Sequence, residues 1–289
     1  MADYRYENQQ RGGSGFGGRL IIAAIIALFA WIMYMNQVEE NPVTKVKQHV
    51  SLSPSDEIKL GLQSAPAMAE QMGGEVPPND PRSIEVKKMG QFLVDHTVAK
   101  DSPWKFQFHL LADTDTINAF ALPGGQVFIT MGLLNELQTE AELAGVLAHE
   151  MGHVIERHSA QQMATNQLGQ LLTFAVGTAA SDQANNGAYQ VAAVVNQALQ
   201  MSYSRGDELQ ADTWGLKLME ASGYDPRAMI AVMQVLKSID RGGGQPAEIF
   251  QTHPNPDLRI QQIEDYLAKN PPPPHLSEGR KLQELYRTR

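Results

Sequence analysis

The 289-residue chain contains no cysteine. Disulfide bonds, thiolate metal sites and cysteine nucleophiles are therefore excluded, and any metal ion must be bound by His, Asp or Glu side chains. Positive charge is also scarce: the net charge is -9, and no stripe of Lys and Arg is present that could follow a phosphate backbone. This argues against a nucleic-acid-binding protein. The hydrophobic content of 43% is enough to fill a core in a chain of this length.

One apolar run stands apart from this composition. The segment LIIAAIIALFAWIMYM, residues 20–35, contains no charged residue. With its flanks it predicts a single transmembrane anchor over residues 20–37, because about 20 apolar residues are needed to cross a bilayer. A cleaved signal peptide is the alternative, but no small-x-small cleavage site follows the run. A lipoprotein anchor is excluded because it requires cysteine.

The charges on either side of the anchor predict its orientation. Arg5, Arg11 and Arg19 precede it, whereas Glu39 and Glu40 follow it. Because positive residues favour the cytoplasmic side, we expect the N-terminus in the cytoplasm and the bulk of the chain across the membrane. In a bacterial cell this describes a single-pass protein of the inner membrane whose main domain is periplasmic.

The rest of the chain divides into further segments. We expect a flexible, Gly-rich N-terminal tail over residues 1–19, a linker with a short helix over residues 38–81, the main domain over residues 82–268 and a proline-rich C-terminal tail over residues 269–289. The main domain opens with a helix and a half-buried strand and ends in a series of helices. This order predicts an α+β fold that is predominantly helical with a small sheet.

The clearest hairpin signal is AFALPGGQVFIT. Residues 119–122 and 126–130 are two short runs around Pro123, Gly124 and Gly125, which supply the backbone angles that a turn needs. The next segment, TEAELAGVLAHEMGHVIERHSA, has an apolar stripe at helical spacing behind a Thr-x-x-Glu capping pattern. It therefore predicts a helix that carries the pattern H-E-x-x-H.

On such a helix, the four-residue spacing of His149 and His153 places both imidazoles on one face. Two imidazoles and a carboxylate are a common ligand set for catalytic zinc, with another position left open for water. Glu150 lies beside that face, where it can serve as the general base for the water molecule. The alternative is an ordinary helix with two surface histidines, so a third ligand is the test.

A carboxylate from elsewhere in the chain could complete the site. Glu156 lies on the same helix and is poorly placed to approach the metal from a third direction. The segment RGDELQAD predicts a second helix with Glu208 and Asp212 on one face, so that Glu208 can bind the metal and Asp212 can support an imidazole N–H. Two acids at this spacing also occur on solvated helix faces. His158 receives no role and is expected at the surface.

Other H-E-x-x-H proteins fit less well. Metzincins need Gly and His at the positions of Glu156 and Ser159. Peptide deformylases resemble this pattern but take a cysteine as the third ligand, and the chain has none. A glutamate third ligand is the type that remains.

Four motifs in this order, LAHEMGHVIERH, YSRGDELQAD, GYDP and THPNPDLRI, resemble those of the zinc metalloproteases of metallopeptidase family 48, the gluzincins that include HtpX, the CAAX prenyl protease and BepA. The resemblance covers about residues 82–267 and implies a zincin-like metallopeptidase domain that binds one Zn2+ per chain. Gln210 replaces the middle acid of the family's E-x-E-A-D pattern. The resemblance assigns zinc binding to His149, His153 and Glu208, catalysis to Glu150 and His253, and support of the ligands to Asp212 and Arg259.

The resemblance also concerns the surroundings of the metal. Zincins of this kind bind substrate as an added strand on a sheet edge, so Asn118, Ala119, Phe120 and Ala121 are expected to bind an extended peptide. A purely structural hairpin is the alternative. Residues 161–203 are too polar for the membrane helices that relatives carry there, and we expect two helices around a loop that cover the cleft as a lid.

Together, the residues and the resemblance predict a membrane-anchored, zinc-dependent endopeptidase. It would hydrolyse peptide bonds in misfolded or membrane-associated proteins, as part of protein quality control. Its expected partners are protein or peptide substrates and the membrane, with no nucleic acid, and no feature of the sequence specifies an oligomeric state. The alternative is a zinc-containing chaperone or assembly factor with a covered, mostly inactive protease site.

Overall fold

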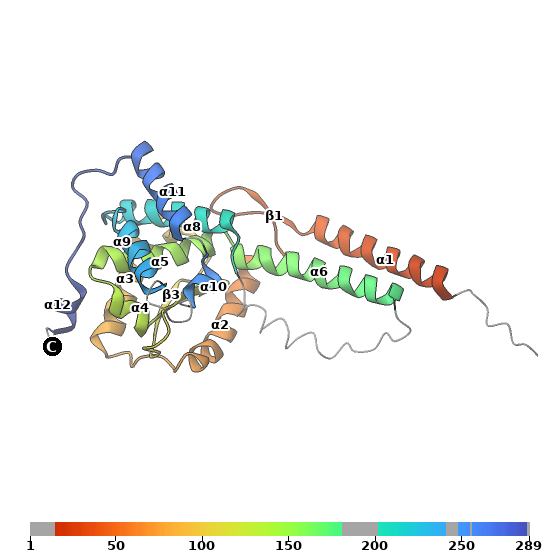
Figure 1. Cartoon of the computed structure of the whole chain (residues 1–289), viewed down its shortest axis with the longest axis horizontal. Coiled ribbons are helices and arrows are strands. Elements are labelled where there is room, and N and C mark those ends of the chain that lie inside the picture. Colours follow the sequence, from red (N-terminus) through yellow and green to blue (C-terminus); the bar gives the residue numbers. More distant parts are fainter. Residues whose placement is uncertain (1–14, 181–201, 241–247, 255, 288–289) are drawn as a thin grey trace, which may run out of the picture.

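The computed structural model describes residues 15–180, 202–240, 248–254 and 256–287 of the chain. Figure 1 shows a rounded body from which two helices, α1 and α6, project side by side. In chain order, the elements are α1 (Gly15–Asn36), β1 (Val38–Glu40), β2 (Lys47–His49), α2 (Pro54–Gln71), α3 (Pro81–Asp95), the 3-10 helix η1 (Val98–Asp101), β3 (Gln107–Leu111), β4 (Ala119–Leu122), β5 (Gln126–Thr130), α4 (Met131–Glu136), α5 (Glu140–Ile155), α6 (His158–Ala180), α8 (Arg205–Ala221), α9 (Ala228–Asp240), α10 (Ile249–Thr252), α11 (Pro256–Lys269) and α12 (Leu282–Arg287).

The main sheet has the strand order β3-β5-β4, with β3 parallel and β4 antiparallel to β5. The predicted hairpin is confirmed, because β4 and β5 have the bounds expected from the sequence. Gly124 and Gly125 have φ angles of 81° and 109°, values that glycine adopts without a steric penalty. Since β5 is the central strand, β4 lies at an edge of the sheet.

Helices cover both faces of this sheet. Side chains such as Phe108 and Ile129 point into the main core, which also contains residues of α3 and α5. Phe128 points the other way and packs with Ala65 and Ala69 of α2. This separation follows from the two-residue period of a strand. The predicted fold class, α+β and predominantly helical with a small sheet, is confirmed.

The central helix of the body is α5, in which every residue from Glu140 to Ile155 is buried. It packs against α8, α9, α3 and β4. Its crossing with α8 is close because both helices have glycine there. A Cβ atom on Gly152 would lie 2.9 Å from the carbonyl oxygen of Ala211, and one on Gly215 would lie 3.4 Å from the backbone nitrogen of His149. The acidic face of α8 is thereby brought against the histidines of α5.

The segment 38–81, expected as a linker with a short helix, is folded against the body. Its hairpin of β1 and β2 reaches the C-terminal end of α5. There Asn41 Nδ2 donates to the carbonyl oxygen of Ile155 at 2.8 Å, and Gln48 Nε2 donates to that of Glu156 at 2.9 Å. These side chains satisfy carbonyl groups that a helix end leaves without partners. The hairpin therefore acts as a cap on the metal-motif helix.

Arg157 joins the same helix end to the N-terminal segment. Its Nε donates to Glu57 Oε1 at 2.7 Å, its Nη1 to Glu39 Oε2 at 3.0 Å and its Nη2 to the carbonyl oxygen of Leu52 at 2.6 Å. Arg157 has a φ angle of 59°, a left-handed backbone conformation that residues other than glycine rarely adopt. Because the side chain is fully buried among these partners, the contacts hold the backbone in this conformation.

The expected C-terminal tail, residues 269–289, packs on the opposite end of α5 over its described part. Arg280 Nη2 donates to Glu140 Oε1 at 2.6 Å, and Arg280 N donates to Glu140 Oε2. Leu282 of α12 is fully buried in the main core. This end of the chain is thus part of the body, because an ion pair and an apolar anchor follow the prolines.

The projecting pair α1 and α6 differs from what the sequence suggested for residues 161–203. Within the described residues, α1 is long and apolar enough to cross a membrane over Gly17–Asn36. The helix α6 runs along it, away from the body (Figure 1). The first part of the segment is therefore not a lid over the body, and residues 181–201 lie outside the described residues.

Candidate metal centre

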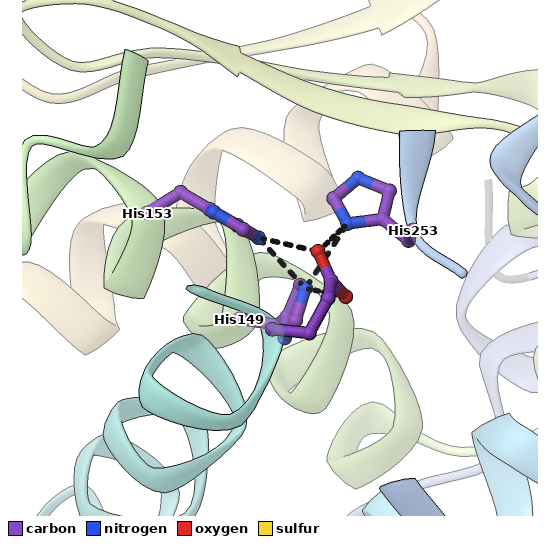
Figure 2. Close-up of side chains that lie close together, drawn as sticks. His149, His153 and His253 are labelled. Atoms are coloured by element: carbon purple, nitrogen blue, oxygen red, sulfur yellow. Dashed lines mark hydrogen bonds and ion pairs between the residues drawn. The ribbon is translucent and has the colours of Figure 1, made fainter. Parts of the chain in front are cut away.

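Three imidazoles and one carboxylate meet where α5 crosses α8. His149 and His153 come from α5, Glu208 from α8, and His253 follows α10. One donor atom from each side chain can be chosen so that all four lie within 4.8 Å of one another. Figure 2 shows the three histidine rings turned toward a common centre. All four residues are buried.

The separations between these donor atoms fit a tetrahedral zinc ion. His149 Nε2 lies 3.1 Å from His153 Nε2, 3.4 Å from His253 Nδ1 and 3.6 Å from Glu208 Oε2. Atoms that each bind zinc at about 2.0–2.1 Å in a tetrahedron are about 3.4 Å apart. Two imidazole nitrogens facing each other in a buried site also favour a cation between them. The residues present therefore fit zinc.

Asp212 and Arg259 hold His149 and Glu208 in place. His149 Nδ1 donates to Asp212 Oδ1 at 2.9 Å, which leaves the lone pair of Nε2 for a metal. Arg259 binds Asp212 through two donors, Nε at 2.8 Å and Nη2 at 2.6 Å. Its Nη1 lies 2.9 Å from Glu208 Oε2. The structure thus brings together all the residues predicted for the zinc site.

Burial and neighbouring charges set the ionisation of the ligands. Burial alone would raise the pKa of Glu208, but the charges of His253 and Arg259 outweigh it and lower the pKa. Burial would likewise raise the pKa of Asp212, which the guanidinium of Arg259 lowers. Burial holds the pKa of His153 well below its usual range. Ionised carboxylates and neutral imidazole are the forms in which these groups bind a metal.

A series of side-chain contacts, which was not predicted from the sequence, holds the ring of His153 in place. The expectation that His158 lies at the surface is wrong, because only 2% of the residue is exposed. His153 Nδ1 lies 2.9 Å from His158 Nδ1, and His158 Nε2 lies 3.0 Å from Gln210 Oε1. With the Gln210 oxygen as acceptor for His158 Nε2–H, His158 Nδ1 accepts from His153 Nδ1–H. His153 Nε2 then keeps its lone pair for the metal.

Two signals in the sequence could have pointed to this chain of contacts. His158 follows His153 by five residues, in the next turn of the chain. Gln210 is the middle residue of the segment ELQAD, and the oxygen of its amide can accept a hydrogen bond. Tyr203, the first residue of the motif YSRGDELQAD, was assigned no role from the sequence, yet its ring is stacked on His153 with 3.9 Å between the ring centroids.

Glu150 lies beside the donor cluster without joining it. Its Oε1 is 3.6 Å from His253 Nε2, and its Oε2 has no hydrogen-bond partner among the described residues. The side chain is 2% exposed, and burial raises its pKa. A carboxylate with a raised pKa takes up a proton more readily, as a general base must. This position suits the role predicted for Glu150.

The residues predicted to bind substrate lie along the edge strand. Asn118 precedes β4, which contains Ala119, Phe120 and Ala121. A cavity of about 120 Å³ opens between β4, α2 and the donor cluster. It is lined by apolar and polar side chains that include Met68, Met72, Phe120, Leu122, Tyr203 and His253. The cavity therefore connects the strand edge with His253 of the donor cluster.

Comparison with known proteins identifies the family. Residues 81–267, more than half of the chain, match the model of peptidase family M48. The chain belongs to this family, whose members are zinc metallopeptidases. The predicted family, enzyme class and zinc cofactor are thereby confirmed for the domain, whereas the roles of individual residues remain predictions.

Two groups of relatives are similar to the chain. The beta-barrel assembly-enhancing protease of Escherichia coli (strain K12) is 33% identical over 207 residues, which cover 69% of this chain and 42% of that protein. The mitochondrial metalloendopeptidase OMA1 of Schizosaccharomyces pombe is 28% identical over 250 residues, which cover 86% of this chain and 72% of that protein. The chain thus spans less than half the length of the first relative.

Proposed function

We propose that this protein is a zinc-dependent endopeptidase, anchored in a membrane by α1, that hydrolyses peptide bonds in misfolded or membrane-associated proteins. The observation that carries the proposal is the buried crossing of α5 and α8, where the donor atoms of His149, His153 and Glu208 converge beside the unpartnered carboxylate oxygen of Glu150. Membership of family M48 and the similarity to a protease and a metalloendopeptidase support the same activity.

The residues of the site divide the work of hydrolysis. Zinc, when bound, supplies a Lewis acid that polarises the substrate carbonyl and lowers the pKa of water. Glu150 accepts a proton from the attacking water and delivers it to the leaving amine. Asp212 and Arg259 keep His149 and Glu208 oriented throughout, through the contacts given above. His253 Nε2 faces Glu150 and is placed to donate to an oxygen on which negative charge develops.

The substrate is proposed to bind as an extended strand along β4. The proposed edge is formed by Asn118, Ala119, Phe120 and Ala121. Because the N–H and C=O of Asn118 already bond to Thr130 of β5, the alternation of an antiparallel pair leaves the backbone groups of Ala119 and Ala121 for a substrate strand. Beside it, the side chains of Met68, Met72 and Phe120 give the adjoining cavity an apolar wall. A large apolar side chain near the cleaved bond is therefore the preferred substrate feature. Unfolded protein segments expose such side chains in an extended chain.

The membrane placement is part of the proposal. The helix α1 suits an anchor by length and composition. Arg19 on one side and Glu39 with Glu40 on the other favour an N-terminus in the cytoplasm. In a bacterium the metal centre would then face the periplasm from the inner membrane. Protease protection of intact spheroplasts tests this, since the body should be digested from outside and protected in inverted vesicles.

A second candidate function rests on His253. With His253 as a fourth donor the site has no open position, and closed sites are typical of structural rather than catalytic zinc. This favours a zinc-containing chaperone or assembly factor with a covered protease site. Proteolysis by the same chain requires His253 to give way to water or substrate.

Casein cleavage by the purified full chain in detergent distinguishes the two functions. An endopeptidase should degrade casein, stop when a chelator removes zinc and recover when zinc is returned. Glu150→Gln should bind one zinc ion and cleave at least about 100-fold more slowly, whereas His149→Ala should lose zinc as well. Full activity of Glu150→Gln would overturn the mechanism, and zinc-loaded but inactive parent protein would favour the chaperone.

A further inference from the structure

The helix α6 begins at the metal centre and ends far from it. Its first residue, His158, contacts His153. From there α6 runs antiparallel to α1, and the two lie side by side beyond the body (Figure 1). One face of each helix is covered by the other, and small side chains mark these faces: Ala30 of α1 is 1% exposed and Ala175 of α6 is 3% exposed. Small residues at a helix contact are typical of pairs packed in lipid.

The two helices change from polar to apolar at the same level. Gln37 Nε2, just beyond α1, donates to Gln167 Oε1 of α6 at 3.4 Å. On the side of this contact that faces the body, α6 carries Gln161, Gln162 and Asn166. On the other side, residues 168–180 read LGQLLTFAVGTAA, alongside the apolar run of α1. The boundary of the expected span therefore continues across α6.

The outer surface of this apolar half resembles that of α1. Leu172 and Phe174 of α6 are 38% and 53% exposed, and Leu28 of α1 is 60% exposed. Residues 159–180 include no Asp, Glu, Lys or Arg. The hydroxyl of Thr173 donates to the carbonyl oxygen of Gly169 at 2.9 Å, so this group is satisfied within the helix. Such a surface suits hydrocarbon, where unpaired polar groups are strongly disfavoured.

We propose that residues 168–180 of α6 enter the same bilayer as α1, so that the two helices form an antiparallel pair surrounded by lipid acyl chains. The occupant of the exposed apolar face is lipid because this face continues that of α1 at the same level. Thirteen residues at about 1.5 Å each extend about 20 Å, less than the roughly 30 Å of a hydrocarbon core. Over its described length, the segment therefore reaches into the hydrocarbon core beside α1. This inference rests on the proposed anchoring by α1.

A membrane position for α6 narrows the class of substrate. The polar part of α6, residues 158–167, separates the metal centre from the lipid boundary by about 15 Å. Peptide bonds presented to Glu150 would therefore lie close to the membrane surface. Segments that emerge from the bilayer fit this position, and their apolar side chains fit the cavity beside β4.

The absence of cysteine makes a direct test simple, since any introduced cysteine is the only one in the chain. The full chain is labelled with an environment-sensitive fluorophore at Leu172→Cys and reconstituted into vesicles of phosphatidylethanolamine and phosphatidylglycerol that carry brominated acyl chains. Thr165→Cys is the matched control, because it lies two turns earlier on the same face of α6 and on the polar side of the boundary. Leu28→Cys reports on α1, and Lys87→Cys reports on the exposed surface of the body.

We expect the bromines to quench position 172 as strongly as position 28, position 165 less and position 87 not at all. Quenching at position 28 with none at position 172 would overturn the inference and leave the anchor intact. No quenching at position 28 would overturn the anchor and, with it, the lipid position of α6. Unchanged thermal unfolding of each variant against the parent confirms that the labelled chains are folded.

Discussion

Two helix pairs in this protein have opposite surroundings. The pair α5 and α8 meets inside the body, and its ionised groups are matched there: Asp212 and Glu208 both face Arg259. The pair α1 and α6 stands apart from the body and turns large apolar side chains outward, such as Ile25 at 60% exposure. The first pair depends on charges that compensate one another inside the protein. The pair α1 and α6 instead depends on the medium that surrounds its exposed apolar side chains.

Removing the guanidinium group of Arg259 should have the largest effect on stability. Arg259→Gln leaves Asp212 and Glu208 buried without their counter-charge, which should lower the free energy of unfolding by about 3–5 kcal/mol. Urea unfolding in detergent measures the loss. Arg227→Gln is the control, since Arg227 makes the same kind of pair with Asp225 but is 60% exposed, and its removal should change little. Equal losses for the two variants would show that the buried network of Arg259 stabilises the protein no more than an exposed ion pair does.

The same substitution in the two helix pairs should have unequal effects. Leu147 of α5 is fully buried, so Leu147→Ala should lower the free energy of unfolding by about 2–5 kcal/mol. Leu28 of α1 is 60% exposed, so Leu28→Ala should change it by less than about 0.5 kcal/mol. Urea unfolding of both variants in one detergent makes the comparison. A large loss for Leu28→Ala would mean that the side chain of Leu28 is buried against protein.

Breaking the contacts of His153 should weaken zinc binding. His158→Ala removes the partner of His153 Nδ1 and should lower zinc affinity about 10–100-fold. Competition with a fluorescent chelator measures the affinity. His96→Ala is the control, because His96 is an exposed histidine of the body that contacts the carbonyl of Phe92. If His158→Ala bound zinc as tightly as the parent, the chain from Gln210 to His153 would have no part in the site.

The smallest predicted effect concerns pH. Burial raises the folded-state pKa of Glu150 above its ordinary 4.5. The stability linked to this group is therefore present below pH 4.5 and is lost as the pH rises through the raised pKa. Glu150→Gln removes that dependence, so near neutral pH the free energy of unfolding of the metal-free variant should exceed that of the parent by on the order of 1 kcal/mol, seen as a higher unfolding temperature. The difference should shrink on acidification, and a variant less stable at neutral pH would contradict the prediction.

Local patterns in the sequence were sufficient for much of the fold and the site. The bounds of β4 and β5 follow from alternating runs around Pro123 and two glycines. The spacing of His149 and His153 on a helix places them on one face, and the same rule applies to Glu208 and Asp212. Each of these predictions depends on residues a few positions apart.

What the sequence could not show are contacts between distant segments. Asn41 and Gln48 cap α5 across separations of 114 and 108 residues. The burial of His158 depends on Gln210 and on the direction in which α6 leaves the body. The apolar run over residues 168–180 is visible in the sequence, but Gln170, Thr173 and Thr178 interrupt it. Only its packing along α1 shows where this run lies.

The cap on the end of α5 limits how far the metal centre can move relative to α1. Glu39, three residues after α1, contacts Arg157, which follows the metal-motif helix. An enzyme on a flexible tether samples a wide volume above its membrane. With α1 as the proposed anchor, these contacts would instead fix the metal centre to the point where the chain leaves the lipid. A peptide bond nearer or farther than this distance would stay uncut whatever its sequence. Geometry would then select substrates before any side chain is recognised.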